Sequence, residues 1–260
     1  MKKLNVIFAA MILAATVVAT PALAAIEVTG SAYVGYFDKY LWRGYDLSGG
    51  LPVVQTGVNL STHGFTLSYW TNIQTKDDDT DKDGVLNYTG GDITETDITL
   101  DYTFSPVDKL NVSVGTILYD LEDGLEDTME AYLGLSLALP MTPTVKIYYD
   151  YDQAEENGLF YTASVSQSFA VVDKLNMSVG ALVSYNDESD YSIPYADPVT
   201  GKNVSYSDWH NYELSASATY AITDQISITP SFVYSSPISD EAKDVIDSEV
   251  LGGLTVTMTF

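Results

Sequence analysis

Acidic side chains at alternate positions are the residues of this sequence with the clearest potential for chemistry. In the segment Glu95–Phe104, Asp97 and Asp101 share the parity of Glu95, while Ile98 and Leu100 have the opposite parity. Alternate residues of a β-strand point to opposite faces, so the carboxylates fall on one face and the apolar side chains on the other. A wall lined with carboxylates concentrates cations. The spacing therefore predicts an acidic interior that favours cations.

A wider set of charged residues is predicted to line this interior. Lys146 has the parity of the acids, and Arg43 lies at the rim where the first alternating segment ends. These two bases are predicted to set up a transverse field against the acids Asp97, Asp101, Glu130 and Glu213. The predicted pore-lining residues are Arg43, Glu95, Asp97, Asp101, Glu130, Lys146, Asp150, Glu213 and Glu249.

One acidic run has the spacing of a calcium loop. Asp79, Asp81 and Asp83 stand at alternate positions and are followed by Gly84, as at the start of an EF-hand loop. The twelfth position is Gly90, where such a loop has a bidentate Glu. The run predicts a weak Ca²⁺ site, and a generic acidic run is the alternative. No other cofactor is expected.

Catalytic constellations are scarce in this sequence. It has no Cys and two His, which excludes thiolate metal sites, cysteine nucleophiles and multi-histidine metal sites. Asp208 and His210 resemble the carboxylate–imidazole pairing of omptin-like proteases, but the parity of His210 matches that of Tyr212 and predicts a side chain directed towards lipid. We therefore expect no enzymatic activity.

The elements that must position these residues are short segments of period-two hydrophobicity. Their number is even, and each has about the length that a tilted strand needs to cross a bilayer. The expected strands are Glu27–Leu41, Leu51–Ser61, Phe65–Gln74, Glu95–Phe104, Leu110–Tyr119, Thr128–Leu139, Val145–Tyr151, Leu159–Phe169, Leu175–Tyr185, Tyr212–Tyr220, Ile226–Tyr234 and Glu249–Phe260. This pattern predicts an all-β fold, a membrane-spanning antiparallel up-and-down β-barrel of about 12 strands.

The connections between these segments alternate in length. Short ones such as 62–64 and 170–174 alternate with long ones such as 75–94 and 186–209. Short periplasmic turns and long outer loops are typical of bacterial outer-membrane barrels. A soluble β-sandwich is the alternative, but it has no reason to sort its loops by length. Pro230 interrupts one strand and predicts a bulge or a locally missing hydrogen bond.

The N-terminus predicts export. Lys2 and Lys3 precede an apolar run, and Ala22-Leu23-Ala24 has the small-x-small pattern of a cleavage site. We expect residues 1–24 to be a cleaved secretory signal peptide and residues 25–260 to be an outer-membrane barrel. The 260 residues carry 11 Lys and Arg against 36 Asp and Glu, a net charge of −25, which argues against nucleic acid as a partner. The expected partners are outer-membrane lipid and lipopolysaccharide, the barrel-assembly machinery and small solutes.

Two motifs resemble known families. The last strand ends on Phe260 and resembles the C-terminal assembly signal of bacterial outer-membrane proteins. Arg43-Gly44, then Pro52-x-x-Gln55-x-Gly57, then Gly64-Phe65 with Trp70, are similar to the TorF-type family of putative porins. This resemblance implies an outer-membrane location and a pore, and it implies little about the solute.

Together these features predict a porin-like passive channel in the bacterial outer membrane, for ions or small hydrophilic solutes, with a cation-preferring acidic mouth. The alternative is a non-conducting structural or adhesin-type barrel with acidic loops that bind calcium.

Overall fold

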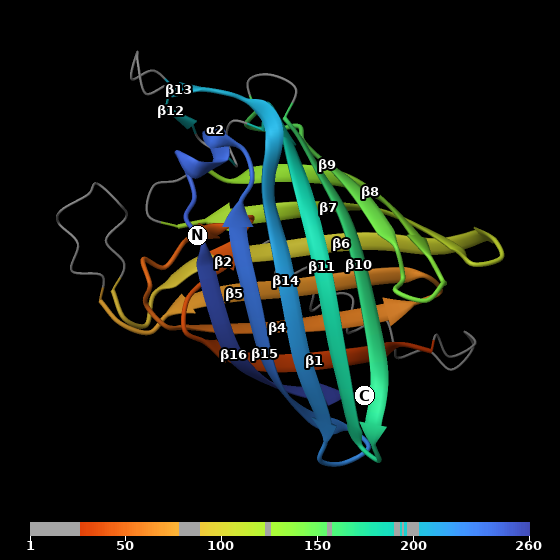
Figure 1. Cartoon of the computed structure of the whole chain (residues 1–260). Helices are drawn as coiled ribbons and strands as arrows, with labels where there is room; N and C mark the ends of the chain where they lie inside the picture. Colours follow the sequence, from red (N-terminus) through yellow and green to blue (C-terminus); the bar gives the residue numbers. More distant parts are fainter. Residues whose placement is uncertain are drawn as a thin grey trace, which may run out of the picture.

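The computed structural model is a closed antiparallel β-barrel in which neighbouring strands in space are neighbours in sequence (Figure 1). It describes residues 27–77, 89–122, 126–154, 158–189, 193, 195–196 and 203–260. The twelve barrel strands are β1 (Thr29–Phe37), β4 (Val53–Thr62), β5 (Phe65–Gln74), β6 (Ile93–Val107), β7 (Leu110–Leu121), β8 (Thr128–Leu137), β9 (Thr144–Asp150), β10 (Leu159–Val172), β11 (Leu175–Asp187), β14 (Ser207–Ala221), β15 (Ile226–Pro237) and β16 (Glu249–Thr259). The prediction of an all-β barrel of about 12 strands is confirmed.

Within the described ranges, few elements lie outside the barrel wall. They are the two-stranded sheets β2 (Leu41–Trp42) with β3 (Tyr45–Asp46) and β12 (Tyr195–Ala196) with β13 (Asn203–Val204), and the helix α2 (Asp240–Lys243). β12, β13 and α2 lie at one end of the barrel, and the β10–β11 and β14–β15 turns lie at the other (Figure 1). Among the described residues, no helix is both long and apolar enough to span a membrane.

The first and last strands close the barrel. β1 pairs with β16 from Ser31 opposite Thr259 to Phe37 opposite Gly253, and with β4 on its other side. The backbones of Gly30 and Phe260 exchange two further hydrogen bonds, at 2.7 and 2.9 Å. Closure satisfies backbone groups that an open sheet would leave unpaired in hydrocarbon. Phe260 thus ends the chain at the seam; its role as an assembly signal remains a prediction.

The outer face of the wall is apolar and the inner face is polar. On β16, Leu254, Val256 and Met258 are 45%, 40% and 47% exposed, which is the pattern of side chains that face lipid. Aromatic side chains near the short turns are also exposed: Phe65, Phe104, Phe169, Tyr220 and Phe260. In contrast, Glu95, Glu130 and Asp150 on the other parity are buried.

Strand boundaries differ from the expected ones where the ladder is irregular. β6 and β10 continue to Val107 and Val172, because a register shift precedes each short turn. The turns that follow place Lys109 and Lys174 at φ values of 63° and 64°, in the two copies of a Val-Asp-Lys-Leu sequence. Pro230 of β15 pairs with Leu254 of β16. Because proline has no N–H to donate, it can take part in the ladder on one side of the strand only.

A lysine on the outer face should destabilise the barrel, and the same change on the inner face should not. Leu214 is 50% exposed on β14, and we expect Leu214→Lys to lower the free energy of unfolding by about 2–4 kcal/mol if it lies near the bilayer midplane. Ser217→Lys on the inner face of the same strand is the matched control. Urea unfolding in lipid vesicles measures both, and equal losses would contradict this assignment of faces.

Candidate functional site: a hairpin inside the barrel

The connection between β1 and β4 folds into the barrel as a short hairpin. β2 and β3 pair through Leu41 opposite Asp46 and Trp42 opposite Tyr45. Arg43 and Gly44 form the turn, with φ values of 47° and 86°. Because this left-handed region strongly favours glycine, Gly44 lets the chain reverse in two residues. The hairpin Leu41–Asp46 is called the inner hairpin below.

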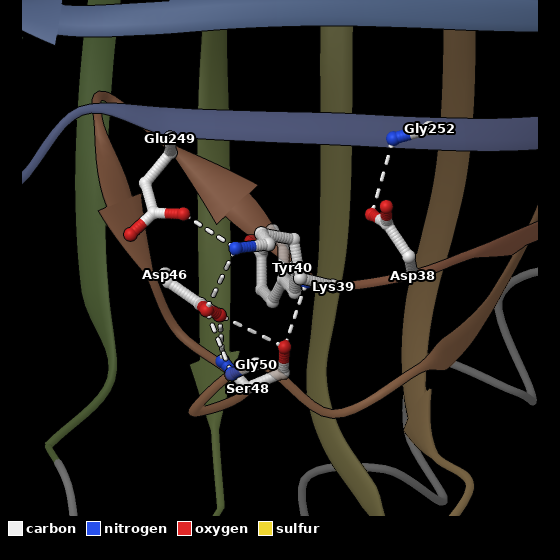
Figure 2. Close-up of polar contacts among 8 residues, drawn as sticks. All are labelled: Asp38, Lys39, Tyr40, Asp46, Ser48, Gly50, Glu249 and Gly252. Atoms are coloured by element: carbon white, nitrogen blue, oxygen red, sulfur yellow. Dashed lines mark hydrogen bonds and ion pairs between the residues drawn. The ribbon is translucent and has the colours of Figure 1, made fainter.

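The base of the inner hairpin is held to the wall by charged groups (Figure 2). The Lys39 ammonium contacts the Glu249 carboxylate on β16 and lies 3.5 Å from a carboxylate oxygen of Asp46. Asp46 also accepts hydrogen bonds from the backbone N–H groups of Ser48 and Gly50, at 3.0 and 2.7 Å. Burial by itself would lower the pKa of Lys39, but its bonds to Glu249 and Asp46 hold that pKa above the ordinary value.

The tip of the inner hairpin places a guanidinium against a buried carboxylate. Arg43 Nη2 donates to Glu130 Oε2 on β8 over 2.8 Å, and the two side chains are only 8% and 1% exposed. The Tyr119 hydroxyl on β7 donates to the same oxygen over 2.9 Å. The attraction of two opposite charges is much stronger in such a dry environment than at a surface, and each charge there needs its partner. This ion pair fixes the tip in the interior.

Aromatic rings surround the same guanidinium. Arg43 Cζ lies 4.5 Å from the ring centroid of Trp42, 4.3 Å from that of Phe160 and 5.2 Å from that of Tyr148. A planar cation is attracted to the negative faces of such rings, and more strongly when water is excluded. Phe160 and Tyr148 are directly opposite each other on β10 and β9. The wall therefore provides an aromatic cage for Arg43.

A buried histidine holds the backbone of the turn. His210 Nε2 lies 2.7 Å from the carbonyl oxygen of Arg43, and His210 Nδ1 is hydrogen-bonded to the Tyr206 hydroxyl. A carbonyl accepts only, so Nε2 carries the proton and Nδ1 accepts from Tyr206. The Tyr45 ring stacks on the imidazole with centroids 6.1 Å apart. Burial raises the pKa of Tyr45, so its hydroxyl stays protonated.

The prediction that His210 faces lipid is wrong. A register shift between Val183 and Tyr185 leaves Ser184 of β11 opposite both His210 and Asn211 of β14. This bulge reverses the parity of the strand and turns His210 inward, where it is 0% exposed. Both ring nitrogens of His210 are bonded to other groups, the Tyr206 hydroxyl and the Arg43 carbonyl, so the Asp208–His210 pairing of omptin-like proteases is not formed.

Tyr40, the residue before the inner hairpin, contacts the acidic wall of β6. The Tyr40 hydroxyl donates to Glu95 Oε2 over 2.9 Å, and its ring lies 5.4 Å from that of Trp70. Tyr40 is only 5% exposed. The connection between β1 and β4 thus spans the interior of the barrel. It contacts Glu249 on β16, Glu95 on β6 and Glu130 on β8.

The structure brings only some of the predicted pore-lining residues to the inner hairpin. Arg43 forms the tip of the hairpin, and Glu95, Glu130 and Glu249 contact it or the residues at its base. Asp97 lies next to them on β6, opposite Trp70 and Tyr119, and one of its carboxylate oxygens is buried with no hydrogen-bond partner among the described residues.

The remaining predicted residues have other surroundings. Asp101 accepts from the Tyr132 hydroxyl, and the Lys146 ammonium lies 5.2 Å from the centroid of the same ring. Asp150 is buried and accepts from Thr128 and from the backbone of the following turn. Glu213 accepts from the side chain of Asn211. Of the two predicted bases, Arg43 forms a direct ion pair with Glu130 and Lys146 lies beside the Tyr132 ring, and the transverse field stays a prediction.

Several residues of this site were not anticipated from the sequence. Lys39 and Tyr40 precede the turn, and Tyr119 and Phe160 come from the wall. The apolar and charged run Tyr40-Leu41-Trp42-Arg43-Gly44, at the end of the first expected strand, is the one signal that could have indicated an inward fold.

The predicted calcium ligands Asp79, Asp81 and Asp83 lie outside the described residues, and so does the predicted signal peptide 1–24. Within the described ranges, no group of three or more His, Asp or Glu residues is arranged to hold a metal ion. The calcium site therefore stays a prediction.

Known structures share this architecture. The chain is similar to the NanC porin, with a TM-score of 0.51 and 12% sequence identity over 89% of this chain and 100% of that one. It is also similar to an outer-membrane channel from Pseudomonas putida F1, with a TM-score of 0.51 and 11% identity over 92% and 97% of the two chains. No family model and no curated protein matches the sequence. The likeness establishes a porin-like barrel fold, and the resemblance to the TorF-type family stays a prediction.

Removing Arg43 should destabilise the barrel by leaving Glu130 buried and unpaired. We expect Arg43→Ala to lower the free energy of unfolding by about 3–5 kcal/mol, and a second change, Glu130→Gln, to recover part of this loss. The control is Lys243→Ala, which breaks an exposed ion pair with Asp240 and should cost less than about 1 kcal/mol. Urea unfolding in vesicles measures all three, and a loss for Arg43→Ala no larger than the control would contradict the buried pair.

Proposed function

We propose that this protein is a porin-like passive channel of the bacterial outer membrane, for ions and small hydrophilic solutes. The observation that carries the proposal is a closed barrel with an apolar outer face and carboxylates, hydroxyls and a lysine on its inner face. A polar interior inside a lipid-facing wall is the arrangement of water-filled outer-membrane channels. The porin-like fold of its structural neighbours supports the same conclusion.

The inner hairpin makes this channel a narrow one. Together with Tyr40, which precedes it, the hairpin places Trp42 and Arg43 across the interior, between the acids of β6 and those of β8. A solute must pass beside these side chains or wait until the hairpin moves. We therefore propose low conductance, with brief transitions between levels, instead of the steady large conductance of an unobstructed barrel.

We also propose a preference for cations. Arg43 neutralises Glu130 and Lys39 neutralises Glu249, but Glu95, Asp97 and Asp101 remain on β6 with no basic residue in an ion pair with them within the described part of the chain. A one-sided row of carboxylates in a low-dielectric wall raises the local concentration of cations. Lys146 and the Arg43–Glu130 pair moderate this preference.

A non-conducting structural or adhesin-type barrel is the second candidate. It is favoured by the burial of the inner hairpin, whose Arg43 and Glu130 side chains are almost inaccessible. In that case the hairpin would stiffen the wall permanently, and the outer acidic loops would carry the function. In either case we propose lipopolysaccharide as a neighbour, and assembly by the machinery that inserts such barrels.

Single-channel recording distinguishes these candidates. The purified protein in a planar bilayer should give stepwise openings, and a KCl gradient should give a reversal potential of the sign for cations. Openings that prefer anions would contradict the proposed cation preference but not the proposed channel. A bilayer that stays silent, although the protein is shown to be folded and inserted, would favour the structural barrel.

The carboxylate of Asp101 should contribute to this selectivity. Asp101→Asn removes one charge of the β6 row, so the reversal potential should move towards zero while the channel still opens. Asp240→Asn is the matched control, because Asp240 lies in α2 and its side chain is 94% exposed outside the barrel. Equal shifts for the two variants would show that the selectivity arises from surface charge.

A further inference from the structure

We propose that the cage around Arg43 is a binding site for small guanidinium-bearing cations, and that Arg43 occupies it as an internal ligand. The cage of the barrel wall consists of Glu130, Tyr119, Tyr148 and Phe160, and it is called the wall cage below. This proposal names a solute class for the proposed channel and in that sense rests on it, but binding itself does not require conduction.

The wall cage has the chemistry that recognises a guanidinium. Glu130 supplies a buried acceptor, 2.8 Å from Arg43 Nη2, and the Tyr119 hydroxyl holds that carboxylate in place. Phe160 and Tyr148 offer ring faces to the planar cation. A guanidinium is weakly hydrated and planar, so it can stack on rings and donate to a carboxylate at the same time. A hydrated K⁺ or a compact ammonium gains less from such walls.

The four residues of the wall cage belong to the barrel and not to the hairpin. They are provided by the consecutive strands β7, β8, β9 and β10, whose ladder holds them in register whether or not Arg43 is present. Arg43, by contrast, is carried by a two-residue turn between two-residue strands. Of the two partners, the hairpin is the one that can leave without breaking the barrel ladder.

Occupation by Arg43 then links solute binding to the state of the channel. The inner hairpin is tethered to the wall, so Arg43 competes at a high effective concentration. A guanidinium-bearing solute that displaces it takes over the contact with Glu130 and removes the ion pair that fixes the tip, so that the hydrogen bond from His210 to the Arg43 carbonyl remains to hold the turn. The same solute would therefore relieve the narrowing that it has to pass.

Chemical rescue tests the wall cage directly. In Arg43→Ala the cage is vacant, and methylguanidinium should bind to the folded protein in detergent and raise its unfolding midpoint. By calorimetry its affinity should exceed that of methylammonium by about tenfold or more, and neutral methylurea should not bind. The double variant Arg43→Ala/Glu130→Gln is the matched control and should lose this binding. Equal binding of the three probes, or binding retained in the double variant, would overturn the proposal.

A second measurement keeps the native arginine and does not depend on the stability of the Ala variant. In Trp70→Phe/Trp209→Phe, Trp42 is the one remaining tryptophan, and it stacks on Arg43 inside the barrel. Methylguanidinium should shift its emission towards the value for water-exposed indole, whereas methylammonium at equal ionic strength should not. No shift at methylguanidinium concentrations well above the effective concentration of the tethered Arg43, on the order of millimolar for a short tether, would overturn displacement.

These outcomes test the proposed binding site and the proposed channel independently. Methylguanidinium binding together with a silent bilayer would contradict the proposed conduction and leave the site intact. Stepwise openings together with no binding to Arg43→Ala would overturn the site and leave the channel intact.

Discussion

The structure depends on the need to hydrogen-bond every backbone group of a chain surrounded by hydrocarbon. Helices or closed barrels meet this need, and this chain meets it through the pairing of β1 with β16. Closure also separates two environments, because side chains alternate strictly along each strand. Exposed leucines and valines on one face and buried carboxylates on the other are consequences of that single constraint.

The interior of the barrel carries inward acids, and the inner hairpin with the residues at its base supplies part of the positive charge that balances them. A closed wall with inward acids such as Glu95 and Glu130 concentrates negative charge in a low-dielectric space. Arg43 and Lys39 each place a cation against one of these acids, and Tyr40 donates a hydroxyl to another. The hairpin is thus both an obstacle in the lumen and a source of counter-charge for the wall. Its aromatic residues Trp42 and Tyr45 fill the space around these polar contacts.

Much of the wall could be predicted from the sequence, because lipid enforces the period-two pattern. The segment Phe65–Gln74 agrees residue for residue with β5. The parity of Glu130 and of Lys146 is also correct, since no bulge precedes them in their strands. The beginning of β14 could not be predicted in this way: one extra residue at His210 and Asn211 reverses the parity, and alternation alone does not reveal a bulge.

The contacts of the inward-folded first loop could not be predicted for another reason. Its position is fixed by partners far away in sequence, with Arg43 and Glu130 separated by 87 residues. The most direct measurement is therefore a nuclear Overhauser spectrum of the unmodified protein in micelles. The account predicts cross-peaks between the side-chain protons of Arg43 and the ring protons of Phe160. Random-coil shifts for residues 41–46 and no such cross-peaks, in a barrel that is otherwise folded, would contradict it.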